Sequence, residues 1–368
     1  MLKNLSRYTT RLDCIHVVPG DARNQLVEEI VNSNLIKYGV LAIYCEDTSM
    51  REKCQELGIS FHTLGFTKKN LFHQFFALLV FVLKTRPRSL FLHSFYPSLL
   101  GIGLVYLCPF TKIVSVRHHN TIHLLSKNRK GIILDRLIAR ISFRTIAVSN
   151  AVKTTMIKQG CREDKIMVIY NGIRIGKFKY EENPPRMRNS TLNLLAAGRL
   201  DWQKNYETML KIALELKDRG VDFNLSILGT GNESYSVSLF EKTKSLGLSD
   251  CVKWQGWQPH IKNWFIESDI FLHTAVDEAC PLVLIEALLA GIPVVASDAG
   301  GSAEVIAGFA PSCAASDTIS YVDQIMFTWE NISEVKIKVR NQIPLVEEKF
   351  NSHRMRKDYE IWTLTFLS

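Results

Sequence analysis

The sequence has few of the features that mark secreted, membrane-spanning or zinc-binding proteins. Its eight cysteines include no Cys-x-x-Cys pair and no histidine partner at metal-ligand spacing, so we predict neither a zinc site nor a disulfide framework. Residues 1–11 are charged and polar, and the apolar run at 14–18 is too short for a secretory leader. We therefore expect a cytoplasmic protein with reduced thiols.

Long apolar runs are also scarce. Residues 71–83 are apolar almost throughout, but a helix that crosses a bilayer needs about 20 such residues. We expect this segment to be a buried helix that covers a sheet. Basic residues at both of its ends keep open a second interpretation, a face that touches lipid; they are Lys68, Lys69, Lys84, Arg86 and Arg88.

Acidic residues are few in the N-terminal half. Residues 1–175 hold 25 lysines and arginines against 11 acidic residues, a net charge of +14, whereas residues 176–368 hold 20 against 25, a net charge of −5. A basic surface of this kind meets nucleic acid, anionic lipid or an acidic substrate. The sequence contains no helix-turn-helix, zinc-finger or RNA-recognition signature, so nucleic acid is the least favoured of these partners.

Strand and helix patterns alternate along the chain in two series. With 368 residues and 46% hydrophobic composition, two domains can each bury a core. A polar, proline-bearing linker at 181–191 separates the series. This order predicts two doubly wound parallel-sheet domains facing a central cleft. The expected strands are 14–18, 40–44, 89–93, 112–116, 145–148 and 166–170, then 192–197, 223–228, 252–254, 270–273 and 293–296.

The strongest chemical signal lies in residues 277–301. A strand ending at His273 leads into a loop with two acids, and a helix begins near Pro281. The start of a helix offers unpaired N–H groups and partial positive charge, which suit a diphosphate. Glu286, more than one turn into the helix, is placed to accept hydrogen bonds from ribose hydroxyls. Glu278, before the helix, lies where a sugar beyond the diphosphate would be.

This arrangement resembles the Glu-x7-Glu motif of the retaining glycosyltransferases of family 4, which have the GT-B fold. Three further segments resemble that family in order and spacing. They are Gly198-Arg199-Leu-Asp-Trp-Gln-Lys204-Asn205, the glycine turn Leu228-Gly229-Thr-Gly231, and Ala147-Val-Ser149-Asn150 together with Tyr170-Asn171-Gly172-Ile173. The resemblance covers about residues 142–306, whereas the first 140 residues match in outline alone.

The resemblance implies a domain plan and a set of site residues. Residues 1–180 would form an acceptor-binding Rossmann-like domain and 192–350 a nucleotide-sugar-binding one, with 181–191 as the linker and 351–368 as a helix that returns to the first domain. Catalytic roles fall to His118, Glu278, Arg199 and Lys204, where His118 either hydrogen-bonds the transferred sugar or handles the acceptor proton, and His119 is the alternative histidine. Further substrate-binding residues are Gly20, Ala279, Cys280, Pro281, Leu282, Val283, Glu286 and Asn171.

The sequence departs from the family pattern in two places. Many members have a Gly-Gly pair in the first loop, where this chain has Gly20 followed by Asp21. The frequent Gly-Phe-Gly after the first acid is Ala279-Cys280-Pro281 here, and proline has no backbone N–H to offer the sugar. These differences bear on which sugar the donor carries.

The function implied is that of a retaining hexosyltransferase that moves a sugar from a UDP- or GDP-sugar to a glycan or lipid-linked acceptor, in bacterial surface polysaccharide or lipopolysaccharide synthesis. No metal or other cofactor is expected, because Arg199 and Lys204 would stabilise the leaving diphosphate and no Asp-x-Asp occurs. The basic first domain favours peripheral contact with an anionic membrane on its cytoplasmic face. The alternatives are a catalytically inactive nucleotide-sugar-binding subunit, or a GT-B-like phosphorylase or epimerase.

Overall fold

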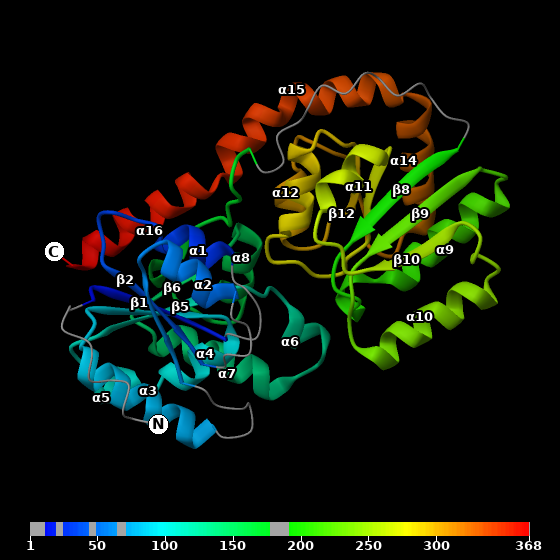
Figure 1. Cartoon of the computed structure of the whole chain (residues 1–368). Helices are drawn as coiled ribbons and strands as arrows, with labels where there is room; N and C mark the ends of the chain where they lie inside the picture. Colours follow the sequence, from blue (N-terminus) through cyan, green and yellow to red (C-terminus); the bar gives the residue numbers. More distant parts are fainter. Residues whose placement is uncertain (1–11, 20–24, 44–48, 65–70, 177–190, 368) are drawn as a thin grey trace. The chain divides into compact units, whose positions relative to one another are not determined.

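The structure is a computed structural model that describes residues 12–19, 25–43, 49–64, 71–176 and 191–367 (Figure 1). The chain forms two compact units. The first contains residues 1–172 and 352–368, and the second contains residues 173–351. Most of the expected linker, 181–191, lies outside the described residues.

The first unit is built on a seven-stranded parallel sheet with the order β3-β2-β1-β4-β5-β6-β7. Its inner strands are buried on both faces, as continuous apolar runs predict. The order reverses direction between β1 and β4, which makes this pair the switch point of the sheet. The strands are β1 Cys14–Val18, β2 Tyr38–Ala42, β3 Ser60–Thr63, β4 Ser89–His93, β5 Lys112–Arg117, β6 Arg144–Ala147 and β7 Ile166–Val168.

Helices connect and cover these strands. They are α1 Gln25–Val31, α2 Ser49–Glu56, α3 Leu71–Thr85, α4 Phe95–Gly101, α5 Leu104–Leu107, α6 Ile122–Leu125, α7 Arg129–Ile141 and α8 Asn150–Lys158. The C-terminal helix α16, Ser352–Leu367, packs beside α1 within the same unit (Figure 1). Arg356 of α16 donates to the Asn32 carbonyl at 2.8 Å, and the rings of Tyr359 and Trp362 contact Phe91 of β4.

Helix α3 contains the apolar segment and has two different faces. Leu78, Phe81 and Val82 are buried against the core of the first unit, as expected for a helix that covers a sheet. Phe72 and Phe76, on the outer face, are 71% and 45% exposed. The expectation of a buried helix therefore describes the inner face and is wrong for the outer one. Among the described residues, no helix has the length and apolarity needed to cross a membrane.

The second unit repeats the architecture with a six-stranded parallel sheet of order β10-β9-β8-β11-β12-β13. Its switch point lies between β8 and β11. The strands are β8 Leu192–Ala197, β9 Phe223–Leu228, β10 Val252–Gly256, β11 Ile270–His273, β12 Val294–Ser297 and β13 Ser312–Cys313. The helices are α9 Tyr206–Asp218, α10 Glu233–Ser245, α11 Ile261–Glu267, α12 Leu282–Leu289, α13 Gly301–Ile306, α14 Thr318–Glu330 and α15 Ile332–Phe350. The predicted fold class, two doubly wound parallel-sheet domains, is confirmed.

The glycine turn after β9 packs directly on the loop that follows β8. Leu200 donates its backbone N–H to the Thr230 carbonyl at 2.9 Å. A Cβ atom at Gly231 would lie 1.9 Å from the Leu200 carbonyl oxygen, a distance that no side chain tolerates. Glycine at 231 therefore allows the two loops to approach and fixes the path of the residues between Gly198 and Lys204.

We predict that Gly231→Ala lowers the free energy of unfolding of the second unit by about 3 kcal/mol, because the backbone must shift to admit the methyl group. Gly220→Ala is the matched control. Gly220 has a φ of +73° and no heavy atom near the position of a Cβ, so it loses about 1 kcal/mol through backbone strain alone. Five of the six tryptophans lie in residues 173–351, so urea unfolding followed by tryptophan fluorescence reports on this unit. An equal loss in both variants would contradict the packing argument.

Candidate functional site

An ion pair between Lys204 and Glu278 lies at the switch point of the second sheet. Lys204 ends the short 3-10 turn Trp202–Lys204 that follows β8, and its Nζ donates to Glu278 Oε1. Glu278 lies in the loop between β11 and α12. The two side chains are 21% and 15% exposed, so the pair is partly shielded from water and can still be reached by a ligand.

Hydrogen bonds to the backbone hold the two loops of this pair together. Thr274 Oγ1, just after β11, donates to the carbonyls of Lys204 and Asn205 at 2.9 and 3.1 Å. The Val276 N–H donates to the Gln203 carbonyl at 2.8 Å. Because both loops are tied at several points, the position of Lys204 relative to Glu278 is determined by the backbone as well as by their charges.

His273, the last residue of β11, is a third member of this cluster that the sequence did not single out as functional. It is buried, and its Nδ1 accepts the Ala275 N–H at 3.3 Å, so a neutral ring carries its proton on Nε2. Nε2 lies 3.3 Å from Glu278 Oε1 without the alignment of a hydrogen bond. Burial, and then the charge of Lys204, lower the pKa of His273 to about 3. The one sequence signal for a functional role of His273 was its position at the end of a predicted buried strand.

A second close backbone contact, made by Gly301, supports the segment between Glu278 and α12. The Gly301 N–H donates to the Glu278 carbonyl at 2.8 Å, and a Cβ at Gly301 would lie 1.9 Å from the Ala279 carbonyl oxygen. Ala279, Cys280 and Pro281 are buried in this segment. Their packing fixes the chain direction as it enters α12.

Helix α12 begins one residue after Pro281, which is its N-cap with a φ of −72°. Leu282 and Val283 form the first turn and are half-buried, and Glu286 lies in the second turn, also half-buried. The first-turn N–H groups and the helix dipole face the carboxyl end of the sheet, as in phosphate-binding α/β proteins. The structure thus brings Lys204, Glu278 and residues 279–286 to one edge of the second sheet.

Arg199 lies on the same loop as Lys204 but has a different partner. Its side chain is 69% exposed and pairs with Asp201 Oδ2 at 3.0 Å. Asp201 also accepts the Gln203 N–H at the start of the 3-10 turn. Exposed pairs of this type contribute at most about 1 kcal/mol, so little free energy opposes a change of partner by Arg199.

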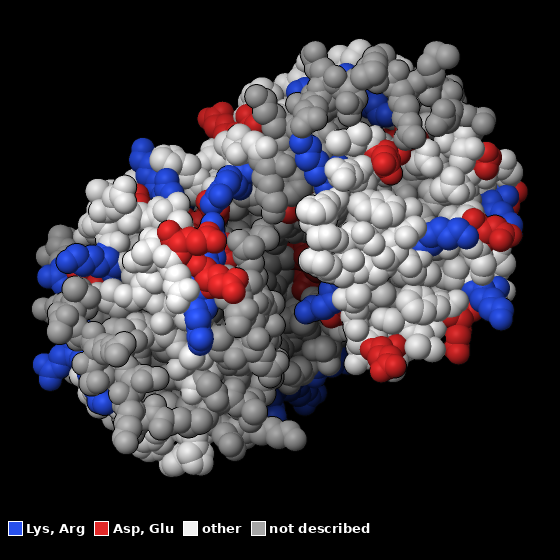
Figure 2. All heavy atoms as spheres, viewed as in Figure 1, with Lys and Arg blue, Asp and Glu red and all other residues white. Residues whose placement is uncertain are grey.

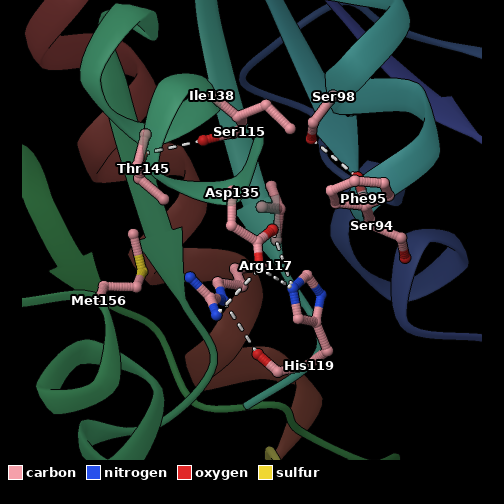
Figure 3. A pocket seen from close by; sticks show the side chains of 12 residues that line it. Ser94, Phe95, Ser98, Ser115, Arg117, His119, Asp135, Ile138, Thr145 and Met156 are labelled. Atoms are coloured by element: carbon pink, nitrogen blue, oxygen red, sulfur yellow. Dashed lines mark hydrogen bonds and ion pairs between the residues drawn. The ribbon is translucent and has the colours of Figure 1, made fainter. Parts of the chain in front are cut away.

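In the first unit, His118 and His119 follow β5 and have different partners. His119 Nε2 lies 3.0 and 3.1 Å from the two oxygens of Asp135 on α7. Arg117 contacts the same carboxylate at 3.3 Å, and Figure 3 shows Arg117, His119 and Asp135 grouped together. Arg117 also donates to the Gln159 side chain and the Asn120 carbonyl. A cavity of about 20 Å³ beside Arg117, His119 and Asp135 has room for a water molecule but not for a sugar ring.

His119, His123 and Asp135 form a group whose ligand atoms lie within 4.8 Å of one another, close enough to consider a metal ion. Burial raises the pKa of Asp135, but the His119 hydrogen bond and the neighbouring charges outweigh burial and lower the pKa below its usual value. The Arg117 guanidinium already balances the carboxylate and would repel a cation placed beside it. We therefore interpret the group as a hydrogen-bonded network that positions His119 and Arg117.

His118 contacts His93 instead. Its Nε2 lies 3.1 Å from His93 Nδ1, and the two rings stack. Burial, and to a smaller extent the charge of His119, lower the pKa of His118 to about 4. His118 is therefore neutral near pH 7, which favours a hydrogen-bonding role over proton donation as an imidazolium.

The other predicted site residues fall outside these clusters. Asn171 is buried after β7 in the first unit. Gly20 lies outside the described residues. The seven cysteines that the structure describes are free thiols.

Comparison with known proteins matches both parts of the chain. The model of the glycosyl transferases group 1 family matches residues 181–326, and the model of glycosyltransferase family 4 matches residues 41–177. The chain belongs to glycosyltransferase family 4. The motifs that carry the resemblance, at 147–150, 170–173, 198–205, 228–231 and 277–301, all lie within these two matched ranges.

Two curated relatives each match about half of the chain. An amylovoran biosynthesis glycosyltransferase of Erwinia amylovora is 31% identical over 192 residues, which are 50% of this chain and 46% of the relative. A lipopolysaccharide 1,6-galactosyltransferase of Escherichia coli K12 is 29% identical over 174 residues, 44% of this chain and 45% of the relative. The chain thus spans about half the length of the curated relatives it matches.

Solved structures support the GT-B fold over nearly the whole chain. The structure of Anabaena HepE in complex with UDP and glucose has a TM-score of 0.82 at 16% identity and covers 96% of this chain and 99% of its own. A sucrose-phosphate synthase from Thermosynechococcus elongatus has a TM-score of 0.81 at 14% identity, with the same coverage. At these identities the likeness concerns the fold.

Proposed function

We propose that this family 4 member transfers a hexose from a nucleotide diphosphate sugar to a glycan or lipid-linked acceptor, with retention of configuration. The observation that carries the proposal is the Lys204–Glu278 pair beside the start of α12, at the switch point where α/β proteins bind nucleotides. Relatives named for amylovoran biosynthesis and lipopolysaccharide galactosylation support a role in bacterial surface polysaccharide synthesis. A fold neighbour solved with UDP and glucose supports a UDP-sugar as donor.

In this proposal the donor diphosphate binds between cationic side chains and the first turn of α12. Lys204 supplies a point charge, and Arg199 exchanges its exposed pair with Asp201 for a forked contact to a phosphate. Charge that develops on the leaving diphosphate is stabilised by these groups, so the proposed reaction uses neither a metal ion nor another cofactor. Retention of the sugar's configuration is inferred from the resemblance to the retaining glycosyltransferases of family 4.

The two glutamates have different roles in the proposal. Glu286, on the second turn of α12, accepts hydrogen bonds from the donor ribose. Glu278 lies on the sugar side, where Lys204 holds its carboxylate and His273 Nε2 lies 3.3 Å from Oε1. Glu278 therefore affects the reacting sugar and Glu286 the nucleotide.

We predict that Glu286→Gln weakens binding of both donor and free nucleoside diphosphate by about 1.5 to 3 kcal/mol, because a charge-assisted hydrogen bond to the ribose is lost. Glu278→Gln should leave nucleotide affinity nearly unchanged and lower turnover, since its contact strengthens in the transition state. Calorimetry with UDP and product release measure the two effects.

Glu267→Gln serves as a control, since it alters an exposed carboxylate at the end of α11, before β11 begins, whereas Glu278 follows the other end of β11. The Glu267→Gln variant should change neither nucleotide affinity nor turnover. Equal weakening of nucleotide binding by Glu278→Gln and Glu286→Gln would refute the division of roles. Tight donor binding with no transfer or hydrolysis in the parent protein would favour the inactive-subunit alternative.

The proposal includes peripheral contact between the first unit and the cytoplasmic face of an anionic membrane. We define the apolar–basic surface as the exposed residues of α3 and of the α5 region with the adjacent cations: Leu71, Phe72, Phe76, Leu83, Lys84, Arg86, Arg88, Tyr106, Leu107 and Phe110. Phe72 and Tyr106 are 71% and 75% exposed. Lys and Arg side chains also stand along the outer edge of the first unit at the left of Figure 2. Exposed aromatic rings beside cations suit an anionic lipid interface.

We predict that the protein sediments with vesicles containing anionic lipid, and that binding falls at high salt because screening weakens the cationic contribution. The double variant Phe72→Ser with Tyr106→Ser should reduce binding about tenfold. Phe327→Ser is the matched control, since Phe327 is 59% exposed on α14 of the second unit. Equal binding to neutral and anionic vesicles at both salt levels would rule out the electrostatic part of the proposal.

A further inference from the structure

The imidazole of His273 in the second unit holds a buried donor that no described residue accepts. Its Nδ1 accepts the Ala275 N–H at 3.3 Å, and a backbone N–H acts only as a donor. The neutral ring therefore carries its proton on Nε2. His273 is 4% exposed, and its Nε2 has no hydrogen-bond partner among the described residues. A buried N–H without a partner is unfavourable, and in native structures such groups often serve a functional role.

The backbone around His273 fixes the position of this ring. The His273 carbonyl accepts from the Tyr321 hydroxyl at 3.3 Å. The next residue, Thr274, donates through Oγ1 to the carbonyls of Lys204 and Asn205 at 2.9 and 3.1 Å. Because Nδ1 is also bonded to the local backbone, the ring has little freedom to turn. The His273 Nε2–H is thus held in place, and a partner must move to it.

The carboxylate of Glu278 is the group that can make this movement. Its Oε1 lies 3.3 Å from His273 Nε2 and also binds Lys204 Nζ. The Glu278 main chain is held by the Gly301 N–H, but its side chain can rotate between staggered conformations. A small rotation brings the carboxylate to the distance of about 2.9 Å that is typical of an N–H···O bond. Glu278 therefore has two donors within reach, one charged and one neutral.

A diphosphate competes with Glu278 for Lys204. In the proposed function the leaving group binds the Lys204 ammonium, and a single positive charge does not balance both a carboxylate and a diphosphate. Repulsion between the two anions favours departure of the carboxylate from Lys204. Glu278 is 15% exposed, so its carboxylate would lack full hydration after departure, and the lost hydrogen bond would oppose donor binding. A second donor removes that opposition.

We propose that Glu278 exchanges partners when the donor binds: its carboxylate leaves Lys204 to the diphosphate and accepts a hydrogen bond from His273 Nε2–H. His273 is a positioning residue in this exchange. The ring stays neutral, because Nδ1 accepts a backbone N–H and cannot also hold a proton. The inference rests on the proposed function for the identity of the anion. It allows Lys204 to act on the diphosphate and Glu278 on the sugar, although the structure pairs them with each other.

Proton–nitrogen NMR on protein labelled with 15N-histidine tests the exchange in the unaltered chain. The buried His273 Nε2–H exchanges slowly with water and is assigned by its loss in a His273 variant. UDP, or inorganic pyrophosphate as a probe without ribose, should move this proton downfield, because a charge-assisted bond to the carboxylate forms. The shift should be much smaller in Glu278→Gln. No movement of the His273 proton with either ligand would overturn the inference.

Two substitutions separate the Nε2 donor from the rest of the ring. His273→Asn keeps an acceptor for the Ala275 N–H and removes the donor, whereas His273→Gln places an amide N–H near the position of Nε2. UDP should bind His273→Asn about tenfold more weakly, because Glu278 then stays on Lys204 and competes with the diphosphate. His273→Gln should recover most of this loss. His260→Gln, an exposed position in the second unit, is the control and should bind UDP as the parent does.

The double variant His273→Asn with Glu278→Gln distinguishes partner exchange from packing. Removal of the competing carboxylate should restore UDP affinity to about that of the parent, so the two substitutions are not additive. A double variant that binds UDP as weakly as His273→Asn alone would indicate a packing defect and overturn the positioning role.

The outcomes also separate this inference from the proposed function. If the His273 proton and the UDP affinities behave as expected while the parent neither transfers nor hydrolyses a UDP-sugar, the proposed function fails and the partner exchange stands. If the parent transfers sugar while UDP leaves the His273 proton unmoved, the partner exchange is refuted and the proposed function stands.

Discussion

Parallel strands deliver their carboxyl ends to one edge of a sheet, and the candidate site depends on this constraint in both units. Lys204 and Glu278 follow β8 and β11, which are neighbours in the second sheet although 74 residues separate the two side chains in sequence. In the first sheet, His93 ends β4 and His118 follows the neighbouring strand β5. Residues from distant parts of the chain therefore meet without long loops, and short loops hold them in place.

Close backbone contact turns this arrangement into a defined site. Gly231 and Gly301 each lie where a Cβ would meet a carbonyl oxygen at 1.9 Å. Their contacts bring the Leu200 and Ala279 segments against the glycine turns that support them. The charged side chains of the site are then carried by loops tied at several points. In the proposed transfer reaction, this reduces the reorganisation needed when charge develops on the leaving group.

Much of the fold follows from the sequence because strand and helix periods are strong in it. Short apolar runs predict the strands at 14–18, 89–93 and 270–273, and a proline predicts the helix start near Pro281. The motif also identified Lys204 and Glu278 separately. Their direct pairing, and the turn of Arg199 toward Asp201, depend on tertiary packing that periodicity does not contain.

Some structural features of the site and its surroundings are not indicated by the local sequence. His16 lies in the middle of a predicted strand, so the sequence indicates an ordinary core residue. Its contact with His93 becomes evident only when β1 is paired with β4. Asp135 lies on α7, in a pattern typical of a solvated helix face, yet it is buried against Arg117 and His119. The sequence left two interpretations of α3 open, a buried helix and a helix with a lipid-facing side, because an apolar run indicates burial without showing which side of a helix meets the sheet.

We propose that cationic side chains of the second unit, led by Lys204, stabilise the leaving diphosphate. This proposal is tested most directly by UDP release from a UDP-sugar in excess chelator, comparing the parent with Lys204→Ala and with Lys211→Ala, an exposed lysine on α9. We expect the parent and Lys211→Ala to keep their rate of UDP release in chelator, and Lys204→Ala to lose about a hundredfold or more. Loss of parent activity that added magnesium restores, together with a parent-like rate in Lys204→Ala, would contradict the proposal.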